Sequence, residues 1–430
     1  MYNEQILMMK YIGLCIVLLV SSVLFAQQPK AFEALDVFEL EYADDPQIAP
    51  DGTTVIYRRT GFDIMEDRSK GNLWMIHADG TNHRKLTSFD GNESQPRWSP
   101  DGTKIAYIAS TSEGSELFMY WVASGVTARL SQLENSPSGL SWSPDGKWLS
   151  FSAMEYVAPP VIASMPKKPK GAKWAETPRI TDRFKHEADG QGYLKPGFRH
   201  IYIISSEGGT ARKITSGDFN HGGSLSWSRD AQHIYFSGNR TEAWEYDFRN
   251  SEIYSVHTQT GIITALTDRN GPDRSPIVSP DGKKIAYIGY DDKVQTYQVS
   301  RLYMMNIDGS NKKEINTNLD RSISNLQWAS DSNLIYCTYD DKGNSKIAQV
   351  TLSGKVSKLA DDLGGTTLGR PYASGSYSVS NNGTIAFTHS QPDRPADVGV
   401  LSKKDKQPKI RTQLNEDLLG YRTLGTVEEI

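Results

Sequence analysis

The sequence predicts an all-β fold, a ring of seven four-stranded sheets known as a seven-bladed β-propeller. One phrase, close to Trp-Ser-Pro-Asp-Gly-Lys-x-Ile-Ala-Tyr, recurs seven times along the 430 residues. The acidic turn position of this phrase is occupied by Asp51, Asp101, Asp145, Asp230, Asp281, Asp331 and finally Asn382. The steps between these positions are 50, 44, 85, 51, 50 and 51 residues. A nearly fixed period of this size indicates a repeat architecture and takes priority over any local pattern.

Each repeat carries the signals of four short strands. Pro-Asp-Gly predicts a bulged hairpin turn between the first two, because Pro presets φ and Gly accepts the positive φ that follows. The second strand, as in residues 104–109, is apolar on both faces, which predicts that both faces are covered. A third strand, such as residues 72–76, and a closing segment, such as residues 84–87, complete the unit. Four strands in about 50 residues are typical of a propeller blade.

Two repeats depart from the turn phrase. Gly is replaced by Ala231 in one and by Ser332 in the other, and Pro is replaced by Arg229 and Ser330. Because residues with a Cβ rarely adopt a positive φ, we expect these two turns to use another loop geometry. The recurring Asp, Trp and Tyr residues are expected to be structural, as turn acids and blade cores.

Length and charge limit the functional classes. Seven blades of this size take up roughly 350 residues, enough for a large β core. The net charge of −4 gives no support for binding to nucleic acid or to an anionic membrane surface. The 37% content of hydrophobic residues fits a globular protein.

Residues 1–26 are expected to be a secretory signal peptide cleaved after Ala26, which places the protein in the periplasm or outside the cell. Residues 11–25 are almost continuously apolar but too short for a comfortable membrane span, so the mature chain is expected to have none. Met8 or Met9 is an alternative start, because the segment before them is unusual for a signal peptide. Cys15 follows a bulky Leu, so no lipid anchor is expected.

Cys337 would be the sole cysteine after cleavage, which excludes an internal disulfide. It lies in the apolar segment 334–338, with no histidine nearby in sequence. We predict a buried core residue and not a catalytic thiol.

The step of 85 residues predicts a long insert within residues 154–199. It exceeds the usual step by about 35 residues. Long loops on a rigid scaffold often carry specificity or partner contacts. The insert contains Lys167, Lys168, Lys170 and Lys173. This run fits a partner-binding patch, although a solvated loop is the usual place for such a charge run.

Motifs for catalysis, cofactors or metals are missing from the sequence. There is no Gly-x-Ser-x-Gly nucleophile elbow, and residues 222–226 come nearest but lack the last glycine. His-Glu-x-x-His and Cys-x-x-Cys are also absent. The histidines are scattered, and we expect surface or loop positions for His77, His83, His186, His200, His221, His233, His257 and His389. The prediction is therefore no catalytic, cofactor-binding or metal-binding residue, and a propeller that binds or shields.

Several segments outside the turn phrase are distinctive: residues 33–40 and 45–52 at the propeller opening, 189–193 and 200–202 at the end of the insert, and 414–419 with 427–430 near the end of the chain. They resemble the N-terminal propeller of the prolyl oligopeptidase (S9) family, in particular its acylaminoacyl-peptidase and dipeptidyl-peptidase-like members. Together they extend the resemblance over residues 33–430.

The resemblance implies a propeller at residues 33–405 and an exit segment at 406–430, leading to an α/β-hydrolase domain beyond Ile430. In the family the Ser, Asp and His triad lies in that domain, so no catalytic residue is transferred to this chain. The glutamate pair with which dipeptidyl peptidases hold a substrate amine has no convincing match, since Glu428 and Glu429 lie in the exit segment. The implied role is to cover the hydrolase and admit short peptide substrates, without catalysis by the propeller.

Two other functions stay open at this point. A complete, non-enzymatic propeller of the TolB type shares the repeats and would bind a protein or peptide partner. A glycan-acting propeller would need clustered carboxylates on one face, which the sequence does not decide.

Overall fold

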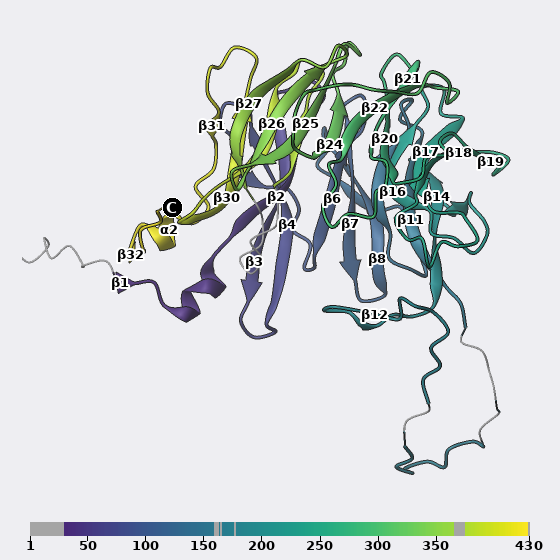
Figure 1. Ribbon diagram of the computed structural model, residues 1–430. Helices are drawn as coiled ribbons and strands as arrows, with labels where there is room; N and C mark the ends of the chain where they lie inside the picture. The colour runs from purple at the N-terminus through teal and green to yellow at the C-terminus, as the bar shows by residue number, and fades with distance from the viewer. Residues whose placement is uncertain (1–29, 159–162, 164–165, 176–177, 365–374, 429–430) are drawn as a thin grey trace, which may run out of the picture.

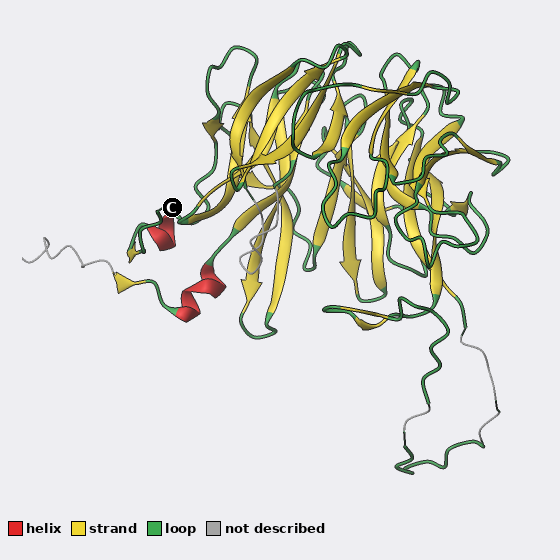
Figure 2. Ribbon diagram, in the orientation of Figure 1, coloured by secondary structure: helices red, strands yellow, loops and turns green. Residues whose placement is uncertain are grey.

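The computed structural model describes residues 30–158, 163, 166–175, 178–364 and 375–428. The predicted signal peptide, residues 1–26 with Cys15, lies outside the described residues. The described strands form the predicted all-β, seven-bladed propeller, with helices only in the segments that precede and follow the ring (Figures 1 and 2). No helix in these ranges is both long and apolar enough to cross a membrane.

Each blade consists of four antiparallel strands that follow one another in sequence. Blades 1 to 3 are β2 (Tyr42–Ile48), β3 (Thr54–Asp63), β4 (Arg68–His77) and β5 (Arg84–Lys85); β6 (Glu93–Trp98), β7 (Lys104–Thr111), β8 (Gly114–Trp121) and β9 (Thr127–Arg129); and β10 (Ser138–Trp142), β11 (Trp148–Tyr156), β14 (Gly197–Ser205) and β15 (Arg212–Lys213). The predicted insert separates β11 from β14 and contains a small hairpin of β12 (Glu187–Ala188) and β13 (Gly192–Tyr193).

The remaining blades repeat this arrangement. Blades 4 to 7 are β16 (Gly222–Trp227), β17 (His233–Gly238), β18 (Glu252–His257) and β19 (Ile263–Ala265); β20 (Asp273–Val278), β21 (Lys284–Gly289), β22 (Arg301–Asn306) and β23 (Lys313–Glu314); β24 (Ile323–Trp328), β25 (Leu334–Asp341), β26 (Asn344–Thr351) and β27 (Val356–Leu363); and β28 (Tyr377–Val379), β29 (Ile385–Gln391), β30 (Arg394–Leu401) and β31 (Lys409–Ile410). Blades 6 and 7 are joined at one pair, Leu363 with His389. β31 belongs to blade 7, although the expected boundary at residue 405 places it in the exit segment.

The hydrophobic core lies between neighbouring blades. One cluster combines Ala286 and Met304 of blade 5 with Ile335 and Cys337 of blade 6, and each of these side chains is buried. Both faces of the second strands are therefore covered, as their sequence pattern predicts. Cys337 is fully buried, and burial raises the pKa of its thiol to about 12. This confirms the prediction of a core cysteine.

The recurring Ser-Pro-Asp-Gly phrase forms a hydrogen-bonded turn. In blade 2, the Ser99 hydroxyl donates to Asp101 Oδ1 at 2.6 Å and accepts from the backbone N–H of Lys104 at 2.9 Å. The backbone N–H of Thr103 also donates to Asp101 Oδ1. Gly102 has a φ of 71°, which glycine adopts at low cost. The phrase is thus a structural turn, as predicted.

The expectation of another loop geometry at Ala231 and Ser332 is wrong. Their φ values are 57° and 61°, close to that of Gly102. The backbone N–H of Ala231 donates to Ser228 O at 3.0 Å, and the N–H of Ser332 donates to Ala329 O at 2.9 Å, as Gly102 does to Ser99 O. The hydrogen bonds around the turn impose the left-handed conformation despite the Cβ.

We expect Ala231→Gly to stabilise the protein by up to about 1 kcal/mol, because it removes the steric cost of a Cβ at positive φ. The reverse change, Gly102→Ala, is a matched control and should cost about 1 kcal/mol or more. Urea denaturation of the purified variants measures both free energies of unfolding. A less stable Ala231→Gly variant would contradict this account.

A second recurring residue joins the blades. In each blade, the residue just before the Ser-Pro-Asp-Gly turn or its equivalent donates a hydrogen bond to the preceding blade. At four junctions the donor is an indole Nε1, each at 3.0 Å: Trp98 to Gln47 O, Trp142 to Arg97 O, Trp227 to Ser150 Oγ and Trp328 to Ile277 O. At the other three it is a backbone N–H: Val278 to Ser226 Oγ, Val379 to Gln327 Oε1 and Ile48 to Ser378 Oγ.

Trp142→Phe should lower the free energy of unfolding by about 1–2 kcal/mol, because the Arg97 carbonyl loses its donor inside the junction. Trp148 of the same blade is a matched control, since it is 39% exposed and does not occupy the position before the turn. Trp148→Phe should change stability by less than about 0.5 kcal/mol. Equal effects of the two substitutions in thermal or urea denaturation would show that the junction bond contributes nothing specific.

The ring closes without an exchange of strands between its two ends. Blade 1 begins with β2 and blade 7 ends with β31, so each blade is built from one continuous stretch of chain. The junction between them is held by the Ile48 bond to Ser378, and by donation from Asn381 N to Pro50 O at 2.9 Å and from Asn382 Nδ2 to Asp51 O at 2.8 Å.

The segments that enter and leave the ring clasp each other. β1 (Lys30–Ala31) pairs in parallel with β32 (Arg422–Thr423), and the Asn415 side chain exchanges two hydrogen bonds with the Glu41 backbone, each at 2.7 Å. Arg422 donates twice to Asp36 in the 3-10 helix η1 (Ala34–Glu39), and these bonds lower the pKa of Asp36 to about 2. Leu418 and Leu419 of α2 (Glu416–Leu419) pack on Leu40. We call these contacts the terminal clasp.

Strand direction divides the loops between two faces of the ring. The first strands begin, and the fourth strands end, on the face that carries the terminal clasp. The same face carries the loops between second and third strands, including the insert with β12 and β13 (Figure 1). The Ser-Pro-Asp-Gly turns lie on the opposite face. We call the face with the clasp and the insert the terminal face.

Candidate functional site

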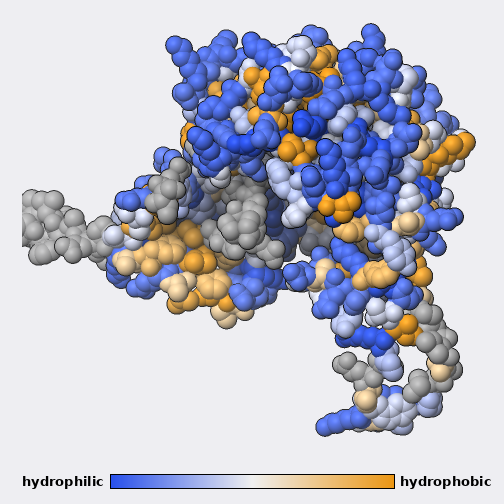
Figure 3. Space-filling model, viewed as in Figure 1, coloured by the Kyte–Doolittle hydropathy of each residue, from blue (hydrophilic) through white to orange (hydrophobic). Residues whose placement is uncertain are grey.

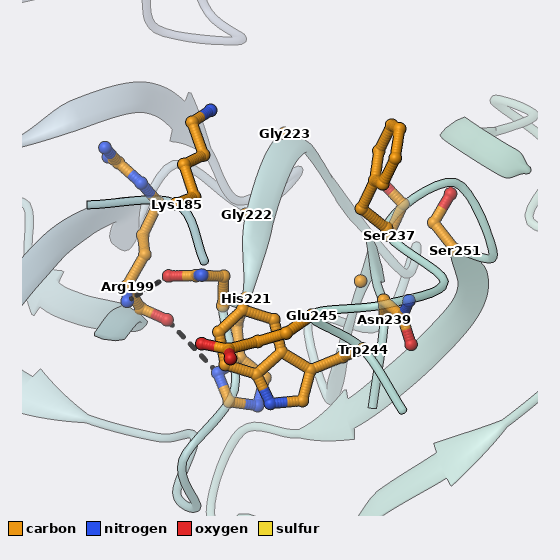
Figure 4. Close-up of a pocket in the computed structure, with 13 residues that line it drawn as sticks. Lys185, Arg199, His221, Gly222, Gly223, Ser237, Asn239, Trp244, Glu245 and Ser251 are labelled. Carbon is orange, nitrogen blue, oxygen red and sulfur yellow. Dashed lines mark hydrogen bonds between the residues drawn. The ribbon is translucent and has the colours of Figure 1, made fainter. Parts of the chain in front are cut away.

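A cavity of about 390 Å³ opens on the terminal face between blades 3 and 4. Its walls come from the end of the insert, the start of β14, the start of β16 and the loop 239–251 between β17 and β18. Figure 4 shows Lys185 and Arg199 on one side and Trp244 and Glu245 near the centre. The insert therefore contributes to a cavity.

One wall of this cavity is formed by two glycines, Gly222 and Gly223, which have no side chain to fill it. A Cβ on Gly222 would lie 2.9 Å from Cδ of Arg199, and Gly223 has a φ of 77°. Side chains at these positions would displace Arg199 or strain the backbone. Gly222 is buried, whereas the backbone of Gly223 is exposed and accessible to a ligand.

Aromatic side chains join the insert to blade 4 beside the cavity. Phe184 of the insert and Tyr246 of the loop 239–251 meet edge to face with ring centroids 4.7 Å apart. Trp244 packs against Phe198 of β14 at 6.2 Å. Phe248 lines the cavity and is 72% exposed. Trp244 and Phe248 therefore give the cavity an apolar part of its wall, suited to a ligand with hydrophobic groups.

His221 is a fully buried imidazole that lines the cavity with both ring nitrogens engaged. Nδ1 donates to Arg199 O at 3.1 Å, as Figure 4 shows, and Nε2 accepts a hydrogen bond from Arg240. These partners require the neutral ring. Burial first, and then the positive charge of Arg240, lower the pKa of His221 to about 4. Because neither nitrogen is free, His221 holds blade 3 to blade 4 and cannot serve as a general base.

His200 fills a position that holds an acid in other blades. In blade 4, Glu252 accepts from the Thr267 hydroxyl, which itself accepts from Ile253 N. The same arrangement occurs in blade 2 with Glu116 and Ser131, and in blade 7 with Asp397 and Thr412. In each, the acid accepts from the hydroxyl, and the hydroxyl accepts from a backbone N–H. In blade 3, Thr215 accepts from Ile201 N and bonds His200 Nδ1 at 3.2 Å. His200 stacks on His221 with centroids 5.2 Å apart.

The expectation that the histidines lie on the surface or in loops is wrong for His200 in particular, which is a buried strand residue. His221 is in a loop just before β16 but is fully buried. The sequence offers no histidine pair at close spacing here, because 21 residues separate these two rings along the chain. The two rings come close only because blades 3 and 4 pack against each other.

The charges of the cavity suit binding better than bond cleavage. Arg199 donates from Nη1 to Ser138 Oγ at 2.7 Å, and Lys185 and Glu245 also line the cavity. Among the residues that the structure describes, Glu245 has no ion pair or hydrogen-bond partner. The lining residues contain no nucleophile next to a free base, and no group of three or more metal-binding side chains occurs in the described ranges. Sequence reasoning placed no residue here, although the loop 239–251 is rich in aromatic residues.

The stability of the protein should fall between pH 6.5 and 4 in part because of His221. The unfolded chain takes up a proton near pH 6.5, whereas folded His221 stays neutral to about pH 4, so acid favours the unfolded state. We expect His221→Gln to remove up to about 1.4 kcal/mol per pH unit from this decline. Unfolding free energies of both proteins at several pH values measure the difference, and parallel pH profiles would contradict the burial of a neutral His221.

Comparison with known proteins finds similarity to peptidases. Residues 168–287, which include the end of the insert and the cavity, match the family model described as the dipeptidyl peptidase IV N-terminal region. The chain is 24% identical over 398 residues to dipeptidyl-peptidase 5 of Porphyromonas gingivalis, covering 89% of this chain and 56% of that protein. It is 22% identical over 417 residues to the uncharacterized peptidase YuxL of Bacillus subtilis, covering 93% and 61%.

Solved structures show the same fold. Pyrococcus horikoshii acylaminoacyl peptidase superposes with a TM-score of 0.68 at 15% identity, over 91% of this chain and 55% of that one. The β-propeller domain of the trilobed protease from Pyrococcus furiosus, described as having an open velcro topology, gives 0.58 at 17% identity, over 88% and 98%. The chain spans 56% and 61% of the length of these two curated relatives. It is a seven-bladed propeller related to the N-terminal domains of the S9 peptidase family.

Proposed function

We propose that this chain is the propeller portion of a secreted S9-type serine peptidase that acts on short peptides. In this proposal the ring covers the active site of an α/β-hydrolase domain and is not catalytic by itself. The observation that carries the proposal is that the terminal clasp, the insert and the cavity share one face. A domain joined to the chain at the clasp would therefore lie beneath the cavity.

Exposed apolar side chains around the clasp support a covered surface there. Leu35 and Val37 of η1, Ile64 and Met65 of the β3–β4 hairpin, and Tyr421 are exposed. Figure 3 shows apolar side chains gathered over this part of the molecule, at the lower left of the view. A domain packed on this surface would bury them, which favours association.

The size of the cavity supports short peptides as substrates. A volume of about 390 Å³ holds a few residues of an extended peptide and excludes a folded domain. The glycine backbone, the aromatic rings and the few charged side chains that line the cavity can bind such a peptide without breaking a bond. The ring would limit access and contribute binding, while the chemistry would belong to the hydrolase.

The location of the protein is part of the proposal. A signal peptide at residues 1–26, cleaved after Ala26, would deliver the protein to the periplasm or the medium. N-terminal sequencing of the secreted product should begin at Gln27. A cytosolic product that keeps residues 1–26 would contradict this part of the proposal.

Expression of the reading frame with and without the sequence downstream of Ile430 tests the function. We expect the downstream frame to encode a Gly-x-Ser-x-Gly elbow, and the longer product to hydrolyse acyl-amino-acid or dipeptide chromogenic substrates with sensitivity to serine reagents. The 430-residue chain alone should show no such turnover. A stop codon after Ile430 with a stable secreted product would instead favour a TolB-like binding propeller. Serine-reagent-sensitive turnover by the chain alone would contradict its non-catalytic role.

A further inference from the structure

The first strands of six blades share a kink at the corresponding position, in the half of the strand toward the terminal face. The kink residue has a positive φ in each: Asp45, Gln95, Gly139, Gly223, Ser275 and Asn325. The strand register shifts there in each blade, as expected for a bulge. The residues just before the kink are Asp44, Ser94, Ser138, Gly222, Arg274 and Ser324. The repeats thus provide an internal comparison of one position in six blades.

Arg274 departs from this comparison as the sole cation. Small residues occupy the position in blades 2, 3, 4 and 6, and blade 1 has Asp44, 3.8 Å from Arg58. Arg274 Nη2 donates to Ser300 Oγ at 3.0 Å, and Ser300 N donates to Ser322 Oγ at 3.2 Å. Ser300 is buried, so the guanidinium rests on a fixed hydroxyl. Within the described part of the chain, Arg274 has no carboxylate partner.

Arg274 lines a second cavity of about 440 Å³, between blades 5 and 6 on the terminal face. Its other lining residues are neutral and carry hydroxyl, amide or apolar groups, among them Thr296, Tyr297, Ser324 and Asn325. The cavity wall therefore holds one positive charge and several hydrogen-bonding groups, with no acid.

The acids next to this cavity are engaged elsewhere. Asp273 is buried and pairs with Arg269 at 3.0 Å. Asp292 accepts from Gln298 Nε2 at 2.6 Å and from Val294 N at 2.8 Å, and it lies 3.8 Å from Arg249. These bonds fix the loop between β21 and β22 that forms one wall. They leave the charge of Arg274 available to a ligand.

We propose that this second cavity is a carboxylate-binding subsite in which Arg274 receives the carboxylate of a bound peptide. A guanidinium presents a planar fork of N–H donors that matches a carboxylate, and the hydroxyl and amide groups around it can bind peptide backbone. The carboxylate comes from the C-terminus of the peptide or from an acidic side chain. Only the identity of the ligand as a peptide rests on the proposed function.

Binding of three capped peptides to the purified chain tests the subsite by isothermal titration calorimetry. The probes are N-acetyl-trialanine with a free carboxylate, its C-terminal amide, and N-acetyl-aspartyl-alanine amide, whose carboxylate lies on the side chain. We expect a carboxylate-bearing probe to bind about tenfold or more tightly than the amide. Whichever acid binds more tightly identifies the source of the carboxylate.

Arg274→Gln should abolish the preference for the acid and leave amide binding unchanged. Arg301→Gln is the matched control, because Arg301 pairs with Glu314 at 3.4 Å and does not line the cavity. Should Arg274→Gln fail to fold, Arg274→Lys keeps the charge without the fork and should reduce the preference. Equal affinities for acids and amide, no binding of either acid, or a preference that survives at Arg274→Gln would overturn the subsite.

The two proposals fail separately. Serine-reagent-sensitive turnover by the longer product, together with equal binding of acid and amide, would overturn the subsite alone. A stop codon after Ile430, together with an Arg274-dependent preference for the acid, would overturn the peptidase proposal alone.

Discussion

The hydrogen bond that each first strand donates to the preceding blade is the constraint on which the rest of the ring depends. Its donor is the residue before the turn phrase, from Ile48 in blade 1 to Val379 in blade 7. Because seven such bonds close a circle, the register of every first strand is fixed. The kink a few residues earlier then falls at one height, on the terminal face. The positions of Gly223 and Arg274 therefore follow from bonds made near the opposite end of the same strands.

Local features were predictable from sequence because the turn phrase contains its own hydrogen-bond partners. Ser99, Asp101 and Gly102 form their turn within six residues, so spacing alone gives the blade count and the site of the insert. The same logic failed at Ala231, where a preference averaged over many proteins is outweighed by the bonds around one turn. The burial of Cys337 followed from its apolar strand.

The cavities were not predictable, because they form between blades. His200 and His221 come together only when blade 3 packs against blade 4. Lys185 lines the first cavity, but it belongs to the insert, which has no repeat pattern. Arg274 did leave a signal in the sequence, as a charged residue where most repeats have a small one. That signal can be interpreted only once the kink shows which residues of the repeats correspond.

Because of the terminal clasp, the chain enters and leaves the ring at the same place. Glu41 and Asn415, 374 positions apart, exchange hydrogen bonds, and β1 and β32 run side by side in the same direction. A module with adjacent ends can be placed within a surface loop of a host domain while the host keeps its own path and core. The clasp thus brings the start and the end of the ring to one place on the face that also carries both cavities.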